Sequence, residues 1–208
     1  FLDKISEHYP ISMHAVGLSL GADHDVDNHH LSKLKALVDR YNPILVSDHV
    51  AWSSSGNAHL NDLLPLPYTK NTLEKISRNI NQVQDMLGRQ ILVENPSTYI
   101  AFKDNDMSEP EFMNRLCHDT GCAMILDVNN IFVQSHNHGI DPYQYIDAID
   151  KKNVLNTPVI FLASNSQQVA LIENSTLEIN NCVLKPVVPE ILIELTSKIV
   201  GKYKSEVL

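Results

Sequence analysis

The chain has 208 residues, of which 43% are hydrophobic and 20% are charged, and this is the composition of a globular domain. Its net charge of -9, with no cluster of lysine or arginine, argues against a nucleic-acid partner, because an acidic surface repels phosphate. No run of about 18 apolar residues is present, and the three cysteines form no C-x-x-C pair, so we expect reduced thiols, no membrane segment and a cytoplasmic protein.

Short β-rich runs alternate with amphipathic helical segments along most of the chain. The runs predict buried parallel strands at residues 11–16, 44–48, 90–94, 123–127 and 159–162. Helix boundaries between them are marked by capping signals. These signals are Asn71 and Ser108, each with glutamate three positions later, Asp141 before Pro142, and Gly88 and Gly121 at helix ends.

This alternation predicts an α/β protein with a parallel sheet, either a barrel or a doubly wound sheet. Polar residues at the ends of successive strands favour a TIM (β/α)8-type barrel, in which such residues converge on one mouth. Because such a barrel needs ~250 residues, we expect it to be incomplete here. We assign residues 1–155 to the barrel segment with the metal site. Residues 156–208 are then a divergent segment, either the end of the barrel with missing stretches or a joined module like a partner protein.

Two connecting segments are candidates for the surroundings of the mouth. The stretch 52–68 is long and rich in proline and leucine, so it is either a lid or substrate wall, or a rigid loop that covers core. His136 and His138 lie too close in sequence to share a helix face and precede Gly139, so we predict a loop near the mouth.

Four residues at the predicted strand ends form a candidate metal site, namely His14, His49, Glu94 and Asp127. Two imidazoles and two carboxylates suit iron, manganese or zinc, and Glu94 could bridge two ions. Asn130 could add an amide oxygen or a hydrogen bond. Alone, a strand histidine is more often a core residue and a carboxylate often a helix cap. Together at one mouth they indicate a metal, because buried carboxylates are costly without a cation.

Several motifs occur in an order that resembles the multinuclear non-haem iron-dependent oxidases, which include the methanobactin biosynthesis oxidase. The resemblance covers about residues 1–155. Its motifs are His14-Ala-Val-Gly-Leu-Ser-Leu-Gly21, Val46-Ser-Asp-His49, Asn61-Asp-Leu-Leu-Pro-Leu-Pro-Tyr68, Leu92-Val-Glu-Asn-Pro-Ser97 and Leu126-Asp-Val-Asn-Asn130.

The resemblance implies a TIM barrel with two or three iron ions that activate dioxygen. The substrate it implies is a residue, usually cysteine, of a ribosomally made precursor peptide that a separate partner protein presents. By the same resemblance His14 and His49 are iron ligands, Glu94 is the bridging carboxylate, Asp127 binds the neighbouring iron, and Asn130 is a further metal contact. Glu94 and Asp127 are the expected catalytic residues.

The later motifs of that family depart from this sequence. Phe161-Leu-Ala-Ser164 stands where the family has a strand that begins with a ligand histidine, and no later Asp-x-His pair follows. Two alternatives therefore stay open. One is a divalent-metal isomerase or hydrolase of the xylose-isomerase-like barrel type, and the other is a degenerate barrel that binds peptides without catalysis.

Overall fold

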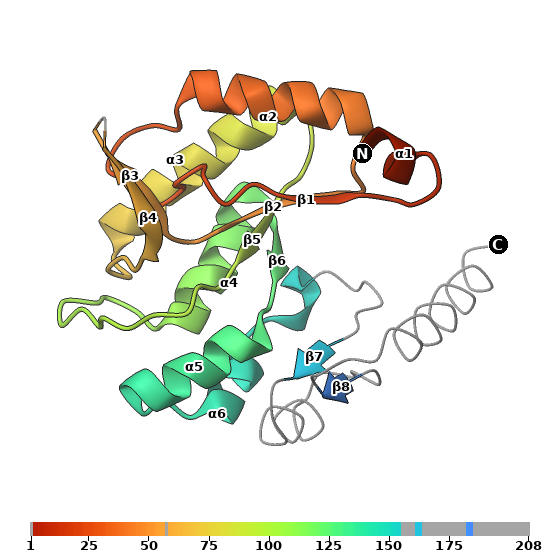
Figure 1. Ribbon diagram of the computed structural model, residues 1–208. Coiled ribbons are helices and arrows are strands. Elements are labelled where there is room, and N and C mark those ends of the chain that lie inside the picture. Colours follow the sequence, from red (N-terminus) through yellow and green to blue (C-terminus); the bar gives the residue numbers. More distant parts are fainter. Residues whose placement is uncertain (1, 57, 155–160, 164–181, 185–208) are drawn as a thin grey trace.

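The computed structural model describes residues 2–56, 58–154, 161–163 and 182–184 (Figure 1). Strands and helices alternate along most of this length, as the sequence predicts. The helices are α1 (Leu2–Ser6), α2 (Asn28–Tyr41), α3 (Lys70–Leu87), α4 (Glu109–Thr120), α5 (Val128–His138), α6 (Pro142–Ala148) and the 3-10 turn η1 (Lys151–Asn153). The strands are β1 (Ser12–His14), β2 (Leu45–His49), β3 (Trp52–Ser55), β4 (Ala58–Leu64), β5 (Leu92–Glu94), β6 (Ala123–Ile125), β7 (Phe161–Ala163) and β8 (Cys182–Leu184).

The main sheet has the parallel strand order β1-β2-β5-β6. With the β3–β4 hairpin set aside, this order is the order along the chain. In a doubly wound sheet the spatial order of the strands reverses at a switch point. In a barrel each new strand lies beside the strand that precedes it in the chain. The predicted α/β class is therefore confirmed, and the sheet is consistent with part of a TIM-type barrel.

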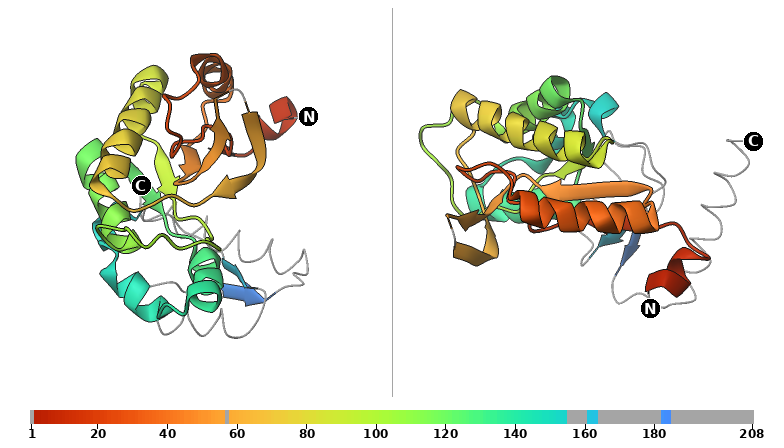
Figure 2. Two further views of the ribbon diagram at one scale, coloured as in Figure 1. Left: turned by 90° about the vertical axis from the view of Figure 1, so that its left-hand side faces the viewer. Right: turned by 90° about the horizontal axis from the view of Figure 1, so that it is seen from above.

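Helices α2, α3 and α4 follow one another around the outer side of the curved sheet, and α5 and α6 continue this layer (Figure 2). Their apolar faces and the sheet form one buried core. Among its largest fully buried side chains are Leu31, Ile76, Ile80, Phe112, Met124 and Val46. This packing holds the carboxyl ends of the strands in a fixed arrangement, which is what a site at the mouth requires.

Most predicted helix boundaries are confirmed. Ser108 and Asp141 cap α4 and α6, and Gly88 and Gly121 end α3 and α4 in the left-handed conformation. The cap predicted at Asn71 is wrong, because α3 begins at Lys70 and its N-cap residue is Thr69. The Thr69 hydroxyl accepts the Thr72 N–H at 3.2 Å, and so satisfies a free donor of the first turn.

The segment 52–68 is not a plain loop. It contains β3 and β4, which form an antiparallel hairpin with a register shift between Trp52 and Ser54. Serine, asparagine and aspartate within these strands weaken the β pattern in the sequence, and only the pairing of the two strands reveals it. Trp52 Nε1 donates to the carbonyl oxygen of Pro65 at 2.9 Å, which ties the hairpin to the chain that follows it. Its role as a lid stays a prediction.

The loop predicted around His136 and His138 is also wrong, since both residues lie in the last turn of α5. Tertiary contacts hold this turn in place. Asn137 Nδ2 donates to the Thr98 carbonyl at 2.8 Å, and His138 Nε2 lies 2.9 Å from the Thr98 hydroxyl. Gly139 then ends the helix with a positive φ of 69°, so the turn signal in the sequence marks the helix end.

The C-terminal segment is described only in part. The predicted strand 159–162 overlaps β7, which pairs in parallel with β8. The remaining predictions for residues 156–208 lie outside the described residues, and the boundary at 155 stays a prediction. Within the described part of the chain, no helix combines the length and apolarity needed to cross a bilayer.

Candidate metal centre

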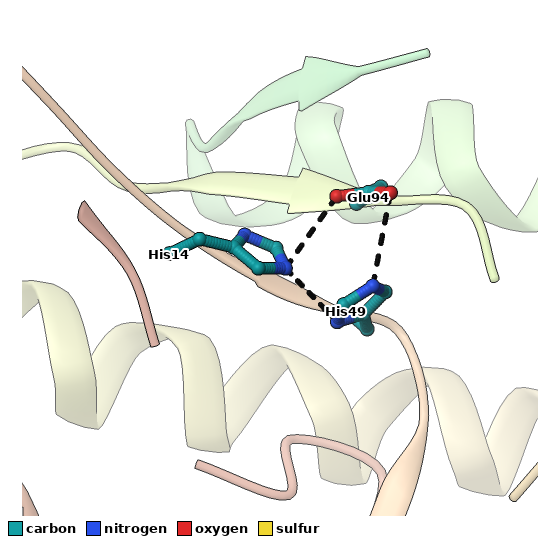
Figure 3. A group of neighbouring side chains, drawn as sticks. All are labelled: His14, His49 and Glu94. Atoms are coloured by element: carbon teal, nitrogen blue, oxygen red, sulfur yellow. Dashed lines mark hydrogen bonds and ion pairs between the residues drawn. The ribbon is translucent and has the colours of Figure 1, made fainter. Parts of the chain in front are cut away.

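Three strand ends bring His14, His49 and Glu94 together, and we call these residues the ligand cluster (Figure 3). His14 ends β1, His49 ends β2 and Glu94 ends β5, and His49 is the register partner of Glu94. His14 Nε2 lies 3.1 Å from His49 Nδ1 and 3.6 Å from Glu94 Oε2, and His49 Nε2 lies 3.7 Å from Glu94 Oε1.

These separations are close to those in the ligand shell of a single metal ion, which could use only one of the two His49 nitrogens that face His14 and Glu94. Two atoms that each lie about 2.1 Å from a metal are about 3.0 Å apart at a right angle and about 4.2 Å apart when opposite. In the ligand cluster, one donor atom from each residue lies within 4.8 Å of the others. Two imidazoles and one carboxylate are also the donor set of the facial triad in non-haem iron(II) oxygenases. The residues present therefore fit a transition-metal ion.

Buried side chains contact both imidazoles, since Ser47 lies against the His14 ring and Asp48 Oδ1 lies 3.6 Å from His49 Nδ1. His14 Nδ1 lies 2.7 Å from the Ser47 hydroxyl, a contact that leaves Nε2 facing the cluster. Asp48 is 1% exposed and accepts the backbone N–H groups of Leu18 at 2.8 Å and His49 at 2.6 Å. Its carboxylate thereby joins the loop that follows His14 to the end of β2, which carries His49.

The electrostatics of the cluster favour a bound cation. The pKa of Glu94 is raised to about 7, mainly by burial and also by the nearby carboxylates of Asp127 and Asp48, against the opposing effect of His49. Burial lowers the pKa of His14, and His49 lowers it too. For His49, burial also acts to lower the pKa, but the carboxylates of Asp48, Glu94 and Asp127 outweigh it and raise the pKa. A metal ion would offset this crowding of carboxylates.

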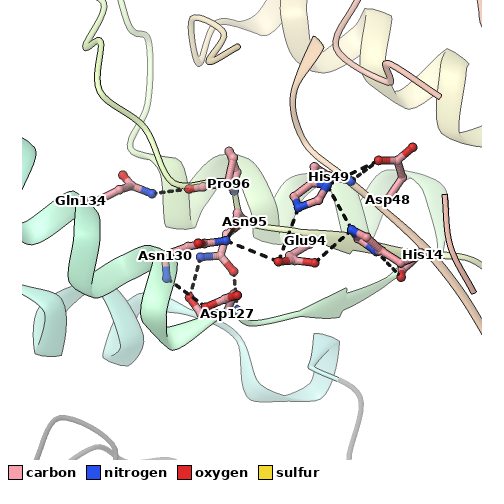
Figure 4. A network of polar contacts seen from close by, with 10 residues as sticks. His14, Asp48, His49, Glu94, Asn95, Pro96, Asp127, Asn130 and Gln134 are labelled. Atoms are coloured by element: carbon pink, nitrogen blue, oxygen red, sulfur yellow. Dashed lines mark hydrogen bonds and ion pairs between the residues drawn. The ribbon is translucent and has the colours of Figure 1, made fainter. Parts of the chain in front are cut away.

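Asp127 lies beside the ligand cluster and is held by two asparagines (Figure 4). It caps α5, and its carboxylate accepts the Asn130 N–H at 2.9 Å. The side chain of Asn95 donates to the Asp127 carbonyl at 3.0 Å and accepts the Asp127 N–H at 2.7 Å. Asn130 Nδ2 donates to the Asn95 carbonyl at 2.9 Å and to Glu94 Oε1 at 3.4 Å.

The sequence-predicted residues therefore fall into two groups. His14, His49 and Glu94 meet in one cluster, whereas Asp127 is not among the residues whose donor atoms converge there, although it is close enough to affect the pKa of Glu94. The side-chain nitrogen of Asn130, rather than its oxygen, faces Glu94. The metal-binding roles of Asp127 and Asn130 stay predictions.

Sequence reasoning missed two residues that support the site, Ser47 and Asn95. Both are polar and buried, with exposed fractions of 2% and 0%. Ser47 follows the apolar residues Leu45 and Val46 in β2 and precedes Asp48, and Asn95 follows Glu94 at a strand end. Both residues could have been found from the sequence as polar residues within or directly after a buried strand, because a buried polar side chain needs a hydrogen-bond partner.

Fold and site together define a class of protein, a parallel α/β barrel-type chain with a candidate metal centre at the carboxyl ends of its strands. A family profile described as the RiPP precursor modification enzyme MbnB/TglH/ChrH matches residues 1–185, where RiPP denotes a ribosomally synthesised and post-translationally modified peptide. The chain belongs to this family.

Curated relatives carry the name UPF0276 protein. One from Psychromonas ingrahamii is 45% identical over 180 residues, which are 86% of this chain and 62% of the relative. One from Paraburkholderia phytofirmans is 48% identical over 167 residues, which are 80% of this chain and 53% of the relative. One from Rhizobium meliloti is 44% identical, also over 167 residues, with the same coverage of both chains. The chain thus spans between about half and two thirds of the length of these relatives.

Proposed function

We propose that this chain is part of an iron-dependent, dioxygen-using oxidase that modifies a residue, usually cysteine, of a ribosomally made precursor peptide. The observation that carries the proposal is the ligand cluster at the carboxyl ends of β1, β2 and β5. Membership of a family of RiPP precursor modification enzymes supports a peptide as the substrate. The two-histidine, one-carboxylate donor set supports iron.

In this proposal His14, His49 and Glu94 hold an iron ion, and Asp127 and Asn130 contribute to a second position beside Glu94. Bound iron would supply the activation of dioxygen and of the substrate thiol. The chain itself supplies orientation, because Ser47 fixes the ring of His14 and Asn130 donates to Glu94. The raised pKa of Glu94, about 7, means that this carboxyl group can also exchange a proton near neutral pH when no cation is bound.

Metal content provides the first test. The purified chain is reconstituted with iron(II) without oxygen, desalted and analysed for bound iron, alone and as the variants His14→Ala and Glu94→Gln. We expect each variant to lose roughly tenfold or more in iron affinity, since each removes one donor of a small set. The matched controls are His118→Ala and Glu111→Gln, whose side chains lie exposed on α4.

The control variants should retain the iron content of the unmodified chain. Equal iron content in all five proteins would show that the ligand cluster is not the binding site. A second measurement, the consumption of dioxygen, separates the oxidase from an isomerase or hydrolase that uses a divalent metal. Only the oxidase should consume dioxygen in a reaction that requires both iron and a cysteine-containing peptide.

One sequence observation favours a second candidate, a degenerate barrel that binds peptides without catalysis. Phe161 stands where the resembled oxidases have a ligand histidine. The same iron analysis tests this alternative, because a degenerate barrel should bind little iron even with the ligand cluster intact.

A separate partner protein that presents the peptide is part of the leading proposal and would be tested by co-purification with the chain.

A further inference from the structure

Two of the cysteines, Cys117 and Cys122, lie in contact at the end of helix α4. Their sulfur atoms are 3.9 Å apart, and both thiols are free. Cys117 belongs to the last turn of α4, and Cys122 directly precedes β6. The pair therefore lies at the amino end of β6, whereas the ligand cluster lies at the carboxyl ends of the strands. The proposed chemistry at the metal centre gives these two thiols no role.

The backbone at the end of α4 fixes the contact between the thiols. Gly121 adopts the left-handed conformation with a φ of 70°, and its N–H donates to the Cys117 carbonyl at 3.0 Å. The Thr120 hydroxyl accepts the Cys122 N–H at 3.2 Å and donates to the Leu116 carbonyl at 2.7 Å. At helix ends of this kind, the residue after the glycine often packs against a residue in the last turn. Here both of those residues are cysteines, so the fold itself brings two thiols together.

An apolar contact is the usual role of such a pair, because a buried cysteine behaves as a small hydrophobic side chain. Two further observations point to chemistry. The sulfur atoms, 3.9 Å apart, must approach by only about 1.9 Å to reach the length of a disulfide bond, a distance that rotation of both side chains can supply. Cys117 and Cys122 also keep exposed fractions of 5% and 4%, whereas the neighbouring Leu116 has none. A small oxidant can therefore reach the pair.

The surroundings of the two thiols make them unequal in acidity. The hydrogen bond with the Cys117 thiol lowers the pKa of Cys122 against the opposing effect of burial, and Thr120 lowers it further. The same hydrogen bond raises the pKa of Cys117, and burial and the carboxylate of Asp150 act in the same direction. The thiolate is the form of cysteine that reacts with an oxidant. We therefore expect Cys122 to react first and Cys117 to follow.

We propose that Cys117 and Cys122 form a redox-active pair, which hydrogen peroxide converts into an intramolecular disulfide. The Cys122 thiolate attacks one oxygen of the peroxide, the O–O bond breaks, hydroxide leaves, and Cys122 becomes a sulfenic acid. The Cys117 thiol then gives up its proton and its sulfur attacks the Cys122 sulfur, so that the S–O bond breaks and the oxygen leaves as water. Both sulfur atoms are thereby oxidised, and one peroxide is reduced to two molecules of water.

The test uses the metal-free chain, because bound iron would itself react with peroxide. The folded chain is treated with a small excess of hydrogen peroxide, catalase removes the excess, and the thiols that remain are blocked with N-ethylmaleimide after denaturation. Trypsin then leaves both cysteines in one peptide, residues 116–151, since no lysine or arginine lies between Arg115 and Lys151. We expect mass spectrometry to show this peptide without maleimide and lighter than the reduced peptide by two hydrogen atoms. Dithiothreitol should restore both thiols.

Single substitutions test the order of the two steps. In Cys117→Ser the second thiol is missing, so Cys122 should accumulate as a sulfenic acid that dimedone labels. In Cys122→Ser the labelling of Cys117 should be roughly tenfold lower, because its thiol is the less acidic one. Cys182→Ser, which removes the third cysteine, is the matched control and should form the disulfide as the unmodified chain does. The unmodified chain and this control test the disulfide even where a buried serine prevents folding.

A peptide 116–151 that carries two maleimide groups after treatment with peroxide would show that the pair is only an apolar contact, and would overturn the proposal. A disulfide that joins Cys117 or Cys122 to Cys182, or that joins two chains, would overturn it as well. Equal dimedone labelling of the two single variants would contradict the order of attack. All these measurements are made without metal, so their outcome is independent of the proposed function.

Discussion

Asn95 has no exposed surface and makes no contact with solvent, yet it holds two candidate ligands in place. Its side chain forms two hydrogen bonds with the backbone of Asp127, and its carbonyl accepts a hydrogen bond from Asn130, which also donates to Glu94. The separation between Glu94 and Asp127 therefore depends on an uncharged residue that would not itself bind metal.

We expect Asn95→Asp to weaken iron binding about 10- to 100-fold, as is typical when a residue that orients ligands is lost. The substitution keeps the shape but replaces the donor to the Asp127 carbonyl by an acceptor, and it adds a negative charge beside Glu94. The measurement is the dissociation constant for iron(II) together with the melting temperature of the metal-free chain.

Asn114→Asp is the matched control for this prediction. Asn114 also forms a two-point contact, since it donates to the Ala148 carbonyl and accepts the Asp150 N–H, each at 2.8 Å. That contact lies on α4, outside the metal centre. The control should lower the melting temperature without a change in iron affinity, and an equal loss of affinity in both variants would contradict the role assigned to Asn95.

At the scale of elements, the loop after β1 packs against the turn after β2 through Gly21. Its N–H donates to the Ala51 carbonyl at 2.9 Å. A Cβ atom at this position would lie 3.0 Å from the Ala51 oxygen and 2.5 Å from the end of Leu66. Glycine is required here by close approach, which explains the end of the motif that begins at His14.

We therefore expect Gly21→Ala to destabilise the chain by about 1–3 kcal/mol, because backbone atoms must move apart to admit the methyl group. Gly17→Ala in the same loop is the control, since an added Cβ there meets its nearest atoms at 3.5 Å, an ordinary contact. Urea denaturation of both variants measures the difference. Similar stability of the two variants would show that the loop adjusts freely.

At the scale of the whole molecule, one buried carboxyl group connects four segments. Glu109 at the start of α4 accepts the hydroxyl groups of Tyr68 and Tyr145, each at 2.7 Å, and the Gln134 side chain at 3.1 Å. Gln134 also donates to the Pro96 carbonyl at 2.8 Å, close to the metal centre. Burial raises the pKa of Glu109, although the three donors act against this.

This raised pKa predicts how stability changes with pH. The folded chain holds the Glu109 proton more tightly than the unfolded chain, whose usual pKa is 4.5. Its contribution to stability is therefore complete below that pH and is lost as the pH rises through the folded pKa, by at most about 1.4 kcal/mol per pH unit. In Glu109→Gln, which keeps the shape of the group, this loss should disappear.

The free energy of unfolding of both proteins is measured by urea denaturation from pH 4 upward. The difference between them isolates Glu109 from other groups that titrate in this range. If the free energy of unfolding changes with pH in the same way in both proteins, the pKa of Glu109 is the same in the folded and unfolded chain, and the prediction is wrong.

Local sequence patterns were sufficient to predict the strands and helix caps that depend only on residues close together in the chain. The strands around His14, His49, Glu94 and residues 123–127 follow from short apolar runs, and the caps at Ser108 and Asp141 from hydrogen bonds that span three residues or fewer. The cap at Thr69 shows the limit of this reasoning, because two nearby polar residues compete and the path of the preceding chain decides between them.

By itself, the sequence determined the alternation of strands and helices and the residues at the strand ends, because apolar periodicity and backbone hydrogen bonding are local. Tertiary structure alone decided that three of those residues converge within 4.8 Å, that Asn95 and Ser47 orient the site, and that residues 52–64 pair as a hairpin. These features depend on contacts between residues about 30 or more positions apart or on strands with weak β propensity, and no local pattern encodes such distances.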